Sequence, residues 1–213
     1  MACLIFSIFV ILAVLNGCFA TISRDEFNLA ITVNGYAQPA DSSIYTCFEE
    51  ATRNYRREEI AMLLAQLIHE SGGFQYREEI ACKYTNCPGF YVDNVGIPGK
   101  YYYGRGFIQL TWGANYKAAS QALGLGDQLL QCPEEVASNT RYAVFVSTWY
   151  WEARVRPVLG DSYKFGLTTK AINGAIECSG GWNERAVNRY RCYQKVADVM
   201  KIQHRAAENG CYN

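Results

Sequence analysis

Residues 57 to 73 constrain the fold most strongly, because apolar side chains recur there at helical spacing until two glycines stop the pattern. The apolar positions are Ile60, Leu63, Leu64, Leu67 and Ile68. Ser71-Gly72-Gly73 follows directly, and glycine commonly ends a helix because it adopts the left-handed conformation without strain. The pattern predicts an amphipathic helix from Arg57 to Glu70 whose apolar face packs in a core.

Helical periodicity dominates the rest of the chain as well. Further helices are expected at Arg24 to Tyr36, Ser43 to Tyr55, Asn115 to Leu123, Thr140 to Arg154, Leu167 to Ile172 and Asn183 to Gln203. Strand signals are confined to Glu79 to Cys82 and Phe107 to Thr111, and Gly104 to Gly106 is expected to form a tight turn. The fold class predicted is mainly α, or α+β with minor β, as a two-lobed helical domain with a cleft.

The first twenty residues differ from the others. Leu4 to Leu15 is an apolar run interrupted only by Ser7, and small residues precede a cleavage point after Ala20. We interpret residues 1–20 as a secretory signal peptide and residues 21–213 as a single domain. The mature chain is then expected to be secreted and extracellular, without membrane association.

Charge and composition exclude several classes of partner. The 20 basic and 20 acidic side chains give no net charge, whereas nucleic-acid binding leaves a basic footprint. The 16 Tyr, 10 Phe and 4 Trp suit a neutral polymer held by aromatic faces and hydrogen bonds. We predict no metal and no cofactor, since His69 and His204 are the only histidines and Gly73 stands where a His-Glu-x-x-His zinc motif needs its second histidine.

Seven cysteines remain once Cys3 and Cys18 leave with the signal peptide. In an oxidising compartment they predict up to three bridges and one leftover thiol. The seven are Cys47, Cys82, Cys87, Cys132, Cys178, Cys192 and Cys211.

Carboxylates flank the glycine pair. Glycosidic bond cleavage needs one carboxylic acid to protonate the leaving oxygen and one carboxylate to activate water or attack the anomeric carbon. Glu70 lies at the edge of the apolar stripe, where partial burial favours the protonated acid, and Glu78 or Glu79 lies in a more polar segment. The alternative is that Glu70 merely completes a helix while Glu78 and Glu79 lie on a solvated surface.

Four separated segments together resemble the plant-type chitinases of glycoside hydrolase family 19, in a compact form. They are His69-Glu70-Ser71-Gly72-Gly73, the run from Tyr102 to Trp112, the run from Ala171 to Cys178, and Gly210-Cys211. The resemblance implies a lysozyme-like helical fold and a chitinase that hydrolyses β-1,4-linked N-acetylglucosamine polymers with inversion. It covers nearly all of residues 21–213.

The resemblance also implies roles for individual residues. Glu70 would be the general acid and Glu79 the general base, with Glu78 as the rival for the base. Thr111, where the family usually has serine, would help to hold the attacking water. Sugar-binding positions would be Tyr102, Gln109, Asn115 and Asn173, although internal hydrogen bonding is the alternative, above all for Tyr102 and Asn115. The implied charged network behind the acid comprises His69, Arg105, Glu177 and Arg189.

Cysteine pairs and overall organisation complete the expectations. The resemblance implies bridges Cys82–Cys87 and Cys178–Cys211, and one further bridge among the other three cysteines has three possible pairings. No cysteine-rich chitin-binding module precedes the domain, so we expect few subsites, weak binding to solid chitin and a monomer. Two other functions stay open: a peptidoglycan-lytic hydrolase and a non-catalytic chitin-binding defence protein.

Overall fold

The computed structural model describes residues 21–213, and the expected signal peptide at residues 1–20 lies outside them. The helices are α1 (Arg24–Val33), α2 (Ser43–Thr52), α3 (Arg57–Ser71), α4 (Gly113–Ala122), α5 (Gln128–Gln131), α6 (Glu135–Ser138), α7 (Thr140–Tyr150), α8 (Arg156–Leu159), α9 (Phe165–Glu177) and α10 (Glu184–Val199). A π-helical turn, η1 (Trp151–Val155), joins α7 to α8. Within the described residues, no helix is long and apolar enough to cross a membrane.

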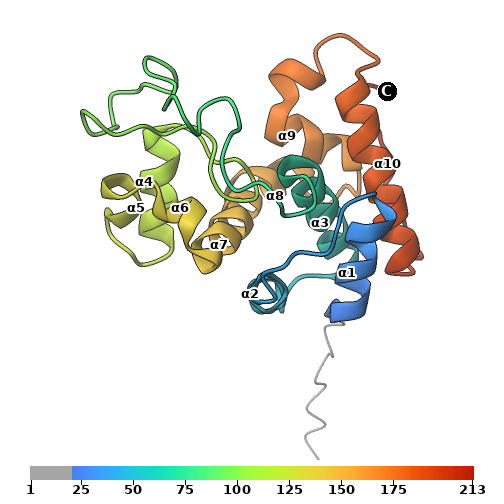
Figure 1. The fold of residues 1–213 in the computed structure, drawn as a ribbon. Coiled ribbons are helices and arrows are strands. Elements are labelled where there is room, and N and C mark those ends of the chain that lie inside the picture. The colour runs from blue at the N-terminus through green and yellow to red at the C-terminus, as the bar shows by residue number, and fades with distance from the viewer. Residues whose placement is uncertain (1–20) are drawn as a thin grey trace, which may run out of the picture.

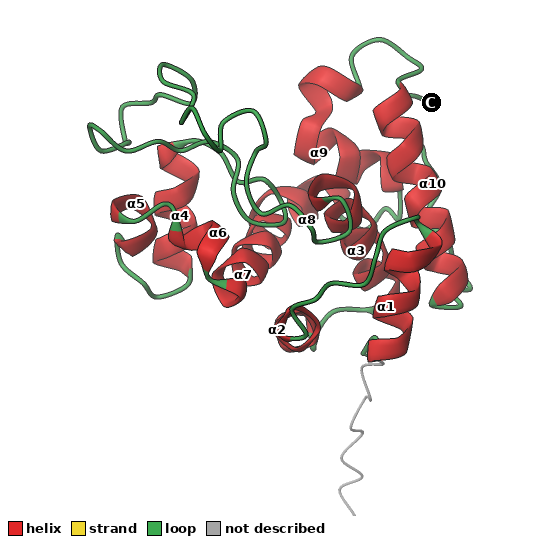
Figure 2. Ribbon diagram, in the orientation of Figure 1, coloured by secondary structure: helices red, strands yellow, loops and turns green. Residues whose placement is uncertain are grey.

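The helices form two groups, which agrees with the predicted helical, two-lobed class. In Figure 1, α4, α5 and α6 lie on one side, α1, α3, α9 and α10 lie on the other, and α7 and α8 run between them. Helix α3 packs against α10 and α9. Long loops from the end of α3 to the start of α4 cross the upper side of the molecule (Figure 2).

Helix α3 confirms the helix predicted from Arg57 to Glu70, but it is buried more completely than an amphipathic stripe implies. Every residue from 60 to 68 is buried, including Gln66. A helix that is apolar on all sides belongs in a core. Its C-cap, Gly72, has φ 57° and donates its backbone N–H to the carbonyl of Ile68, as the glycine stop predicts.

The two expected strands are wrong. In residues 21–213 only isolated bridges form, among them Glu78 with Arg105 and Arg105 with Leu110. Residues 80–82 and 106–109 form turns instead, and Gln109 has a positive φ of 55°. A residue in the left-handed region interrupts the extended backbone that a ladder requires. The turn expected at Gly104 to Gly106 lies slightly later, because Arg105 pairs with Leu110 and Gly106, with φ 72°, begins the turn.

A row of aromatic rings connects the N-terminal helices to the long loops. The ring of Phe27 in α1 lies 5.2 Å from that of Phe74, which lies 4.9 Å from that of Phe107. All three side chains are buried. Phe74 stands between Glu70 and Glu79 in the sequence, so the loop that follows α3 is anchored in the core between the two carboxylates.

Both bridges implied by the family resemblance are present: Cys82–Cys87 and Cys178–Cys211. The expected third bridge is wrong, because Cys47, Cys132 and Cys192 are all free thiols. Cys47 lies in α2, Cys132 follows α5 and Cys192 is buried in α10. The expectation of up to three bridges and one leftover thiol rests on the oxidising compartment, whereas pairing also requires the Cα atoms to come within about 7 Å.

Candidate active site

The C-terminal end of α3 places Glu70 against a buried cluster of charges. Arg189 of α10 approaches Oε1 of Glu70 with its Nη2 at 2.5 Å. The same guanidinium donates to both carboxylate oxygens of Glu177, from Nε and from Nη2, each at 2.8 Å. The side chains of Arg189 and Glu177 are 2% and 1% exposed, whereas that of Glu70 is 15% exposed. Glu70 is therefore the member of this cluster that solvent reaches most easily.

The side-chain amide of Gln66 helps to hold this cluster in place. Gln66 accepts a hydrogen bond from Nη1 of Arg189 at 2.8 Å and donates to the hydroxyls of Thr168 and Thr169 in α9. Sequence reasoning missed Gln66, although an amide within the apolar run of α3 is a usable signal, because a buried polar group needs partners. Gln66 thus links three helices: its own α3, α9 through the two threonines, and α10 through Arg189.

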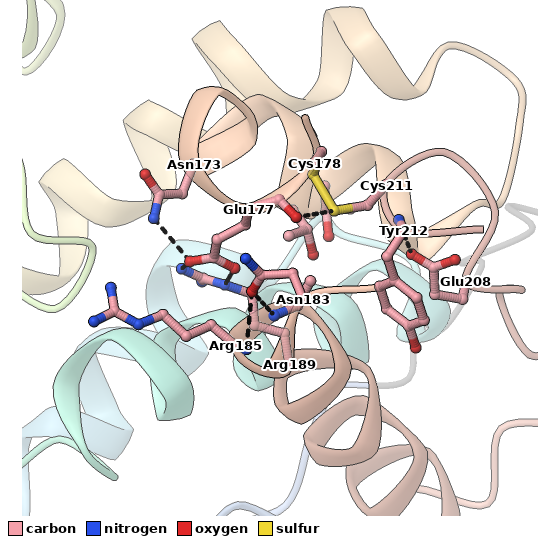
Figure 3. The surroundings of a disulfide bond; sticks show 12 residues. Asn173, Glu177, Cys178, Asn183, Arg185, Arg189, Glu208, Cys211 and Tyr212 are labelled. Atoms are coloured by element: carbon pink, nitrogen blue, oxygen red, sulfur yellow. Dashed lines mark hydrogen bonds and ion pairs between the residues drawn. A yellow bond between two sulfur atoms is a disulfide. The ribbon is translucent and has the colours of Figure 1, made fainter. Parts of the chain in front are cut away.

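Asn173 sits at a break in α9, where its backbone leaves the helical region at φ −141° and ψ 32°. Its Nδ2 donates to Oε1 of Glu177 at 2.7 Å. Figure 3 shows the amide nitrogen directed at Glu177 and the amide oxygen on the opposite side. The Cys178–Cys211 bridge follows directly after Glu177 and ties this end of α9 to the C-terminal segment (Figure 3).

The proton balance of the cluster follows from its charges. Two carboxylates share one guanidinium, so the fully ionised cluster carries one net negative charge in a buried position, and uptake of one proton relieves it. Burial alone would raise the pKa of Glu177, but hydrogen bonds from Arg189 and the charge of Arg189 outweigh it and hold that pKa below its usual value. Glu177 is therefore the ionised partner of Arg189, and Glu70 is the carboxyl group of the cluster that lies nearest to solvent.

His69 adjoins the cluster but remains uncharged at neutral pH. Burial, reinforced by the positive charge of Arg189, lowers the pKa of His69 to about 4. The imidazole lines a polar groove together with Tyr36 and Cys192. Its contribution to the charged network implied by the family resemblance is therefore that of a neutral neighbour.

The second candidate carboxylate lies in the loop beyond the glycines. Glu79 accepts a hydrogen bond from the hydroxyl of Tyr91 at 3.1 Å and one from the backbone N–H of Gly104 at 3.2 Å. A Cβ on Gly104 would lie 3.0 Å from Oε1 of Gln109 and 3.3 Å from Cβ of Glu79. The absence of a side chain at Gly104 thus lets Glu79 and Gln109 share one small space. Tyr91 is a residue that sequence reasoning missed.

Glu78 takes part in a different set of contacts. Its Oε1 accepts a hydrogen bond from the buried hydroxyl of Tyr103 at 2.9 Å, and the Tyr103 ring carries the Arg105 guanidinium 3.7 Å above its centroid. Arg105 also donates to the hydroxyl of Tyr116 at 3.2 Å. The structure therefore groups Arg105 with Glu78 and two tyrosines, whereas the family resemblance groups it with the network behind Glu70.

All four expected sugar-binding side chains have internal partners: Asn173 donates to Glu177, and Gln109 donates from Nε2 to the carbonyl of Gly106 at 3.0 Å. The Tyr102 hydroxyl is buried, donating to the carbonyl of Leu130 at 2.8 Å and accepting from the N–H of Ile97 at 3.0 Å. Its geometry favours the alternative of internal hydrogen bonding. Asn115 donates to the carbonyl of Thr111 at 3.0 Å and stays partly exposed, as does Thr111.

Tyr150, at the end of α7, lies near Glu70, and Arg154 of η1 lies near Tyr150; sequence reasoning gave neither residue a role in the site. Burial raises the pKa of Tyr150, Arg154 counteracts this, and the negative charge of Glu70 raises it further. Arg154 donates to Oδ1 of Asn115 at 3.2 Å.

Comparison with known proteins agrees with this arrangement. A family model described as chitinase class I, glycoside hydrolase family 19, matches residues 31–160. The chain is similar to Endochitinase At2g43590 of Arabidopsis thaliana, with 40% identity over 82% of this chain and 64% of the relative. Basic endochitinase CHB4 of Brassica napus is 41% identical over 79% of this chain and 62% of the relative. The chain thus spans less than two thirds of the length of these relatives.

Solved structures share the fold. Chitinase C from Streptomyces griseus superposes with a TM-score of 0.72 and 27% identity, covering 90% of this chain and 96% of that one. A bacterial family 19 chitinase superposes with a TM-score of 0.73 and 26% identity, covering 89% and 99% of the two chains. The two similarities cover the described residues almost completely.

Proposed function

Because the chain belongs to the chitinase class I family, glycoside hydrolase family 19, we propose that it is an endochitinase. It hydrolyses β-1,4 linkages between N-acetylglucosamine residues by an inverting mechanism with a general acid and a general base. The observation that carries the proposal is the shared guanidinium of Arg189, which holds Glu70 at 2.5 Å and Glu177 at 2.8 Å.

The cluster around Arg189 supports Glu70 as the proton donor. A general acid must hold a proton at the pH of the reaction while the glycosidic oxygen is within reach. Glu177 is buried and held by two hydrogen bonds from Arg189, which keep its pKa below the usual value, so it serves as the ionised partner of that guanidinium. Glu70 is the exposed member of the cluster, so it is the carboxyl group that a glycosidic oxygen can reach.

The hydrogen bonds of Glu79 support it as the general base. Tyr91 and the N–H of Gly104 are neutral donors that orient the carboxylate and leave it free acceptor sites for a water molecule. Glu78 is instead engaged by the buried Tyr103 hydroxyl. Thr111 supplies the hydroxyl that we propose as a second contact for the attacking water.

Sugar recognition is assigned to the side chains that keep free polar atoms near these carboxylates. Gln109 packs beside Glu79 at Gly104, and Asn173 has an amide oxygen directed away from Glu177. Both amides can pair with the N-acetyl and hydroxyl groups of the substrate. Asn115 is a third candidate, whereas Tyr102 acts by positioning the loop around Ile97. We further propose that the protein is secreted after removal of residues 1–20 and acts as a monomer.

Hydrolysis of a chitin hexasaccharide, followed by proton NMR during the first minutes, tests the proposal. The expected product is the α-anomer, because inversion of a β-linkage gives α. Glu70→Gln should reduce kcat by several orders of magnitude, Glu79→Gln should do the same, and the matched control Glu78→Gln should keep most of it. Initial release of the β-anomer, or equal losses in Glu78→Gln and Glu79→Gln, would contradict the assignment.

Two further assays separate the competing functions. Lysis of bacterial cell walls without hydrolysis of the hexasaccharide would identify a peptidoglycan-lytic hydrolase. Tight binding of the hexasaccharide by the wild-type protein without any turnover would identify a chitin-binding protein on an inactive scaffold.

A further inference from the structure

A groove of about 640 Å³ lies on the side of the Glu78 segment away from the catalytic contacts of Glu79. It is formed by residues 75–84 and by the chain around α6, including Glu134, Ala137 and Ser138. Its volume falls within the range of about 300–1,000 Å³ typical of ligand sites. Glu78 lines this groove, whereas the oxygens of Glu79 are bound by Tyr91 and Gly104.

The groove presents unusually exposed aromatic and apolar side chains. Tyr84 is 87% exposed, Ile80 is 66% exposed and Tyr76 is 49% exposed. Exposed apolar groups that share one concave surface indicate a binding site more strongly than scattered ones do. Because these three side chains lie on one short segment, we infer that a ligand covers them.

Both tyrosines lie on constrained segments. A Cβ on Gly72 would lie 2.8 Å from the Tyr76 ring, so this ring is packed directly on the backbone at the end of α3. The backbone of Tyr84 lies inside the short loop closed by the Cys82–Cys87 bridge, while its side chain is exposed. A segment that is ordered before binding loses little conformational entropy when a ligand covers it.

The charges around the groove are balanced and largely used internally. Arg77 is paired with Asp41, and Glu78 accepts a hydrogen bond from Tyr103. Lys83 lies 5.7 Å from the centroid of the Tyr84 ring and is offset by Glu134 on the opposite wall. Such a surface gives an anionic polymer no net attraction, and it suits a neutral ligand with one apolar face and a hydroxyl-rich rim.

We propose that this groove is a second binding site for a chitin oligosaccharide, separate from the catalytic contacts. The C–H face of an N-acetylglucosamine ring covers Tyr84 or Tyr76, and its hydroxyl and amide groups reach Glu134, Ser138 and Gln75. The choice of ligand rests on the proposed function, because the same polymer would be held near the catalytic carboxylates.

Calorimetric titration with chitin tetrasaccharide tests the proposal in the Glu70→Gln background, where turnover is blocked. Two oligosaccharides are expected per protein molecule, and backbone amide NMR signals of residues 75–84 should shift during the titration. Adding Tyr84→Ala should weaken the second site about tenfold, whereas adding Tyr84→Phe should preserve it. Tyr163→Ala removes another exposed tyrosine, which lies outside this groove, and serves as the matched control with two sites retained.

A stoichiometry of one, or no effect of Tyr84→Ala on either site, would overturn the proposal. Hydrolysis of the hexasaccharide by the wild-type protein is measured in parallel. Hydrolysis with a single binding site would reject the second site alone, whereas the absence of hydrolysis would reject the proposed endochitinase whatever the stoichiometry.

Discussion

Replacement of Glu177 by glutamine should lower kcat without removing a group that touches substrate, because Glu177 fixes the guanidinium that contacts Glu70. Glu177 accepts hydrogen bonds from Nε and Nη2 of Arg189 at 2.8 Å each, and the same Nη2 approaches Glu70 at 2.5 Å. A glutamine amide offers one acceptor oxygen where the carboxylate offers two, so one of the two contacts is lost. A hydrogen bond to a charged group contributes about 1.5–3 kcal/mol.

The expected result is a loss of about 1.5–3 kcal/mol of unfolding free energy and a kcat about ten- to hundredfold lower, because a less firmly held guanidinium positions Glu70 less exactly. The assay is hydrolysis of chitin tetrasaccharide, with urea unfolding followed by circular dichroism. Glu59→Gln is the control, because Glu59 pairs with Arg156 elsewhere in the fold. A kcat that stays at the wild-type value while stability falls would refute the reasoning.

Three other changes test separate parts of the structure. Burial lowers the native pKa of His69 to about 4, so the unfolded chain binds a proton on this imidazole at higher pH than the folded chain does. The free energy of unfolding of the wild type should therefore fall by up to about 3 kcal/mol as the pH is lowered from 6.5 to 4. His69→Gln should flatten this pH dependence when it is measured by urea unfolding. Gly104→Ala places a Cβ 3.3 Å from that of Glu79 and should lower kcat about ten- to hundredfold with little change in melting temperature; unchanged kinetics would contradict the crowding. Cys211→Ser opens the bridge to Cys178, which closes a separation of 33 residues, and should cost about 3–4 kcal/mol of unfolding free energy; a loss below about 1 kcal/mol would show that the bridge constrains little.

Helices were predictable because their signals are local. The apolar spacing from Ile60 to Ile68 and the glycine stop at Gly72 locate α3 nearly to the residue. The two strand predictions were wrong because short apolar runs have the same composition in a strand as in a turn packed on a core. The identity of Gln109 does not indicate that its φ is positive. The helix predicted from Leu167 to Ile172 ends directly before Asn173, where the backbone leaves the helical region, but the sequence did not indicate that α9 resumes and extends to Glu177.

The candidate site was predictable in its residue types but not in its partners. Motif order identified Glu70, Glu177 and Arg189 as neighbours, and the structure places them in one cluster. The same reasoning put Arg105 in that cluster, whereas it lies against Tyr103. Contacts between residues far apart in the chain depend on how helices pack, and a single sequence carries no direct record of that packing.

The aromatic row through Phe27, Phe74 and Phe107 has a consequence for how this protein responds to its surroundings. Hydrocarbon contact helps to hold the loop between Glu70 and Glu79 in place, beside the ion pair of Arg77 with Asp41. Dissolved salt weakens attraction between ions but leaves such contact almost unchanged, whereas cooling weakens it. The distance between the two acidic groups should therefore change little at high salt concentration and become more variable at low temperature.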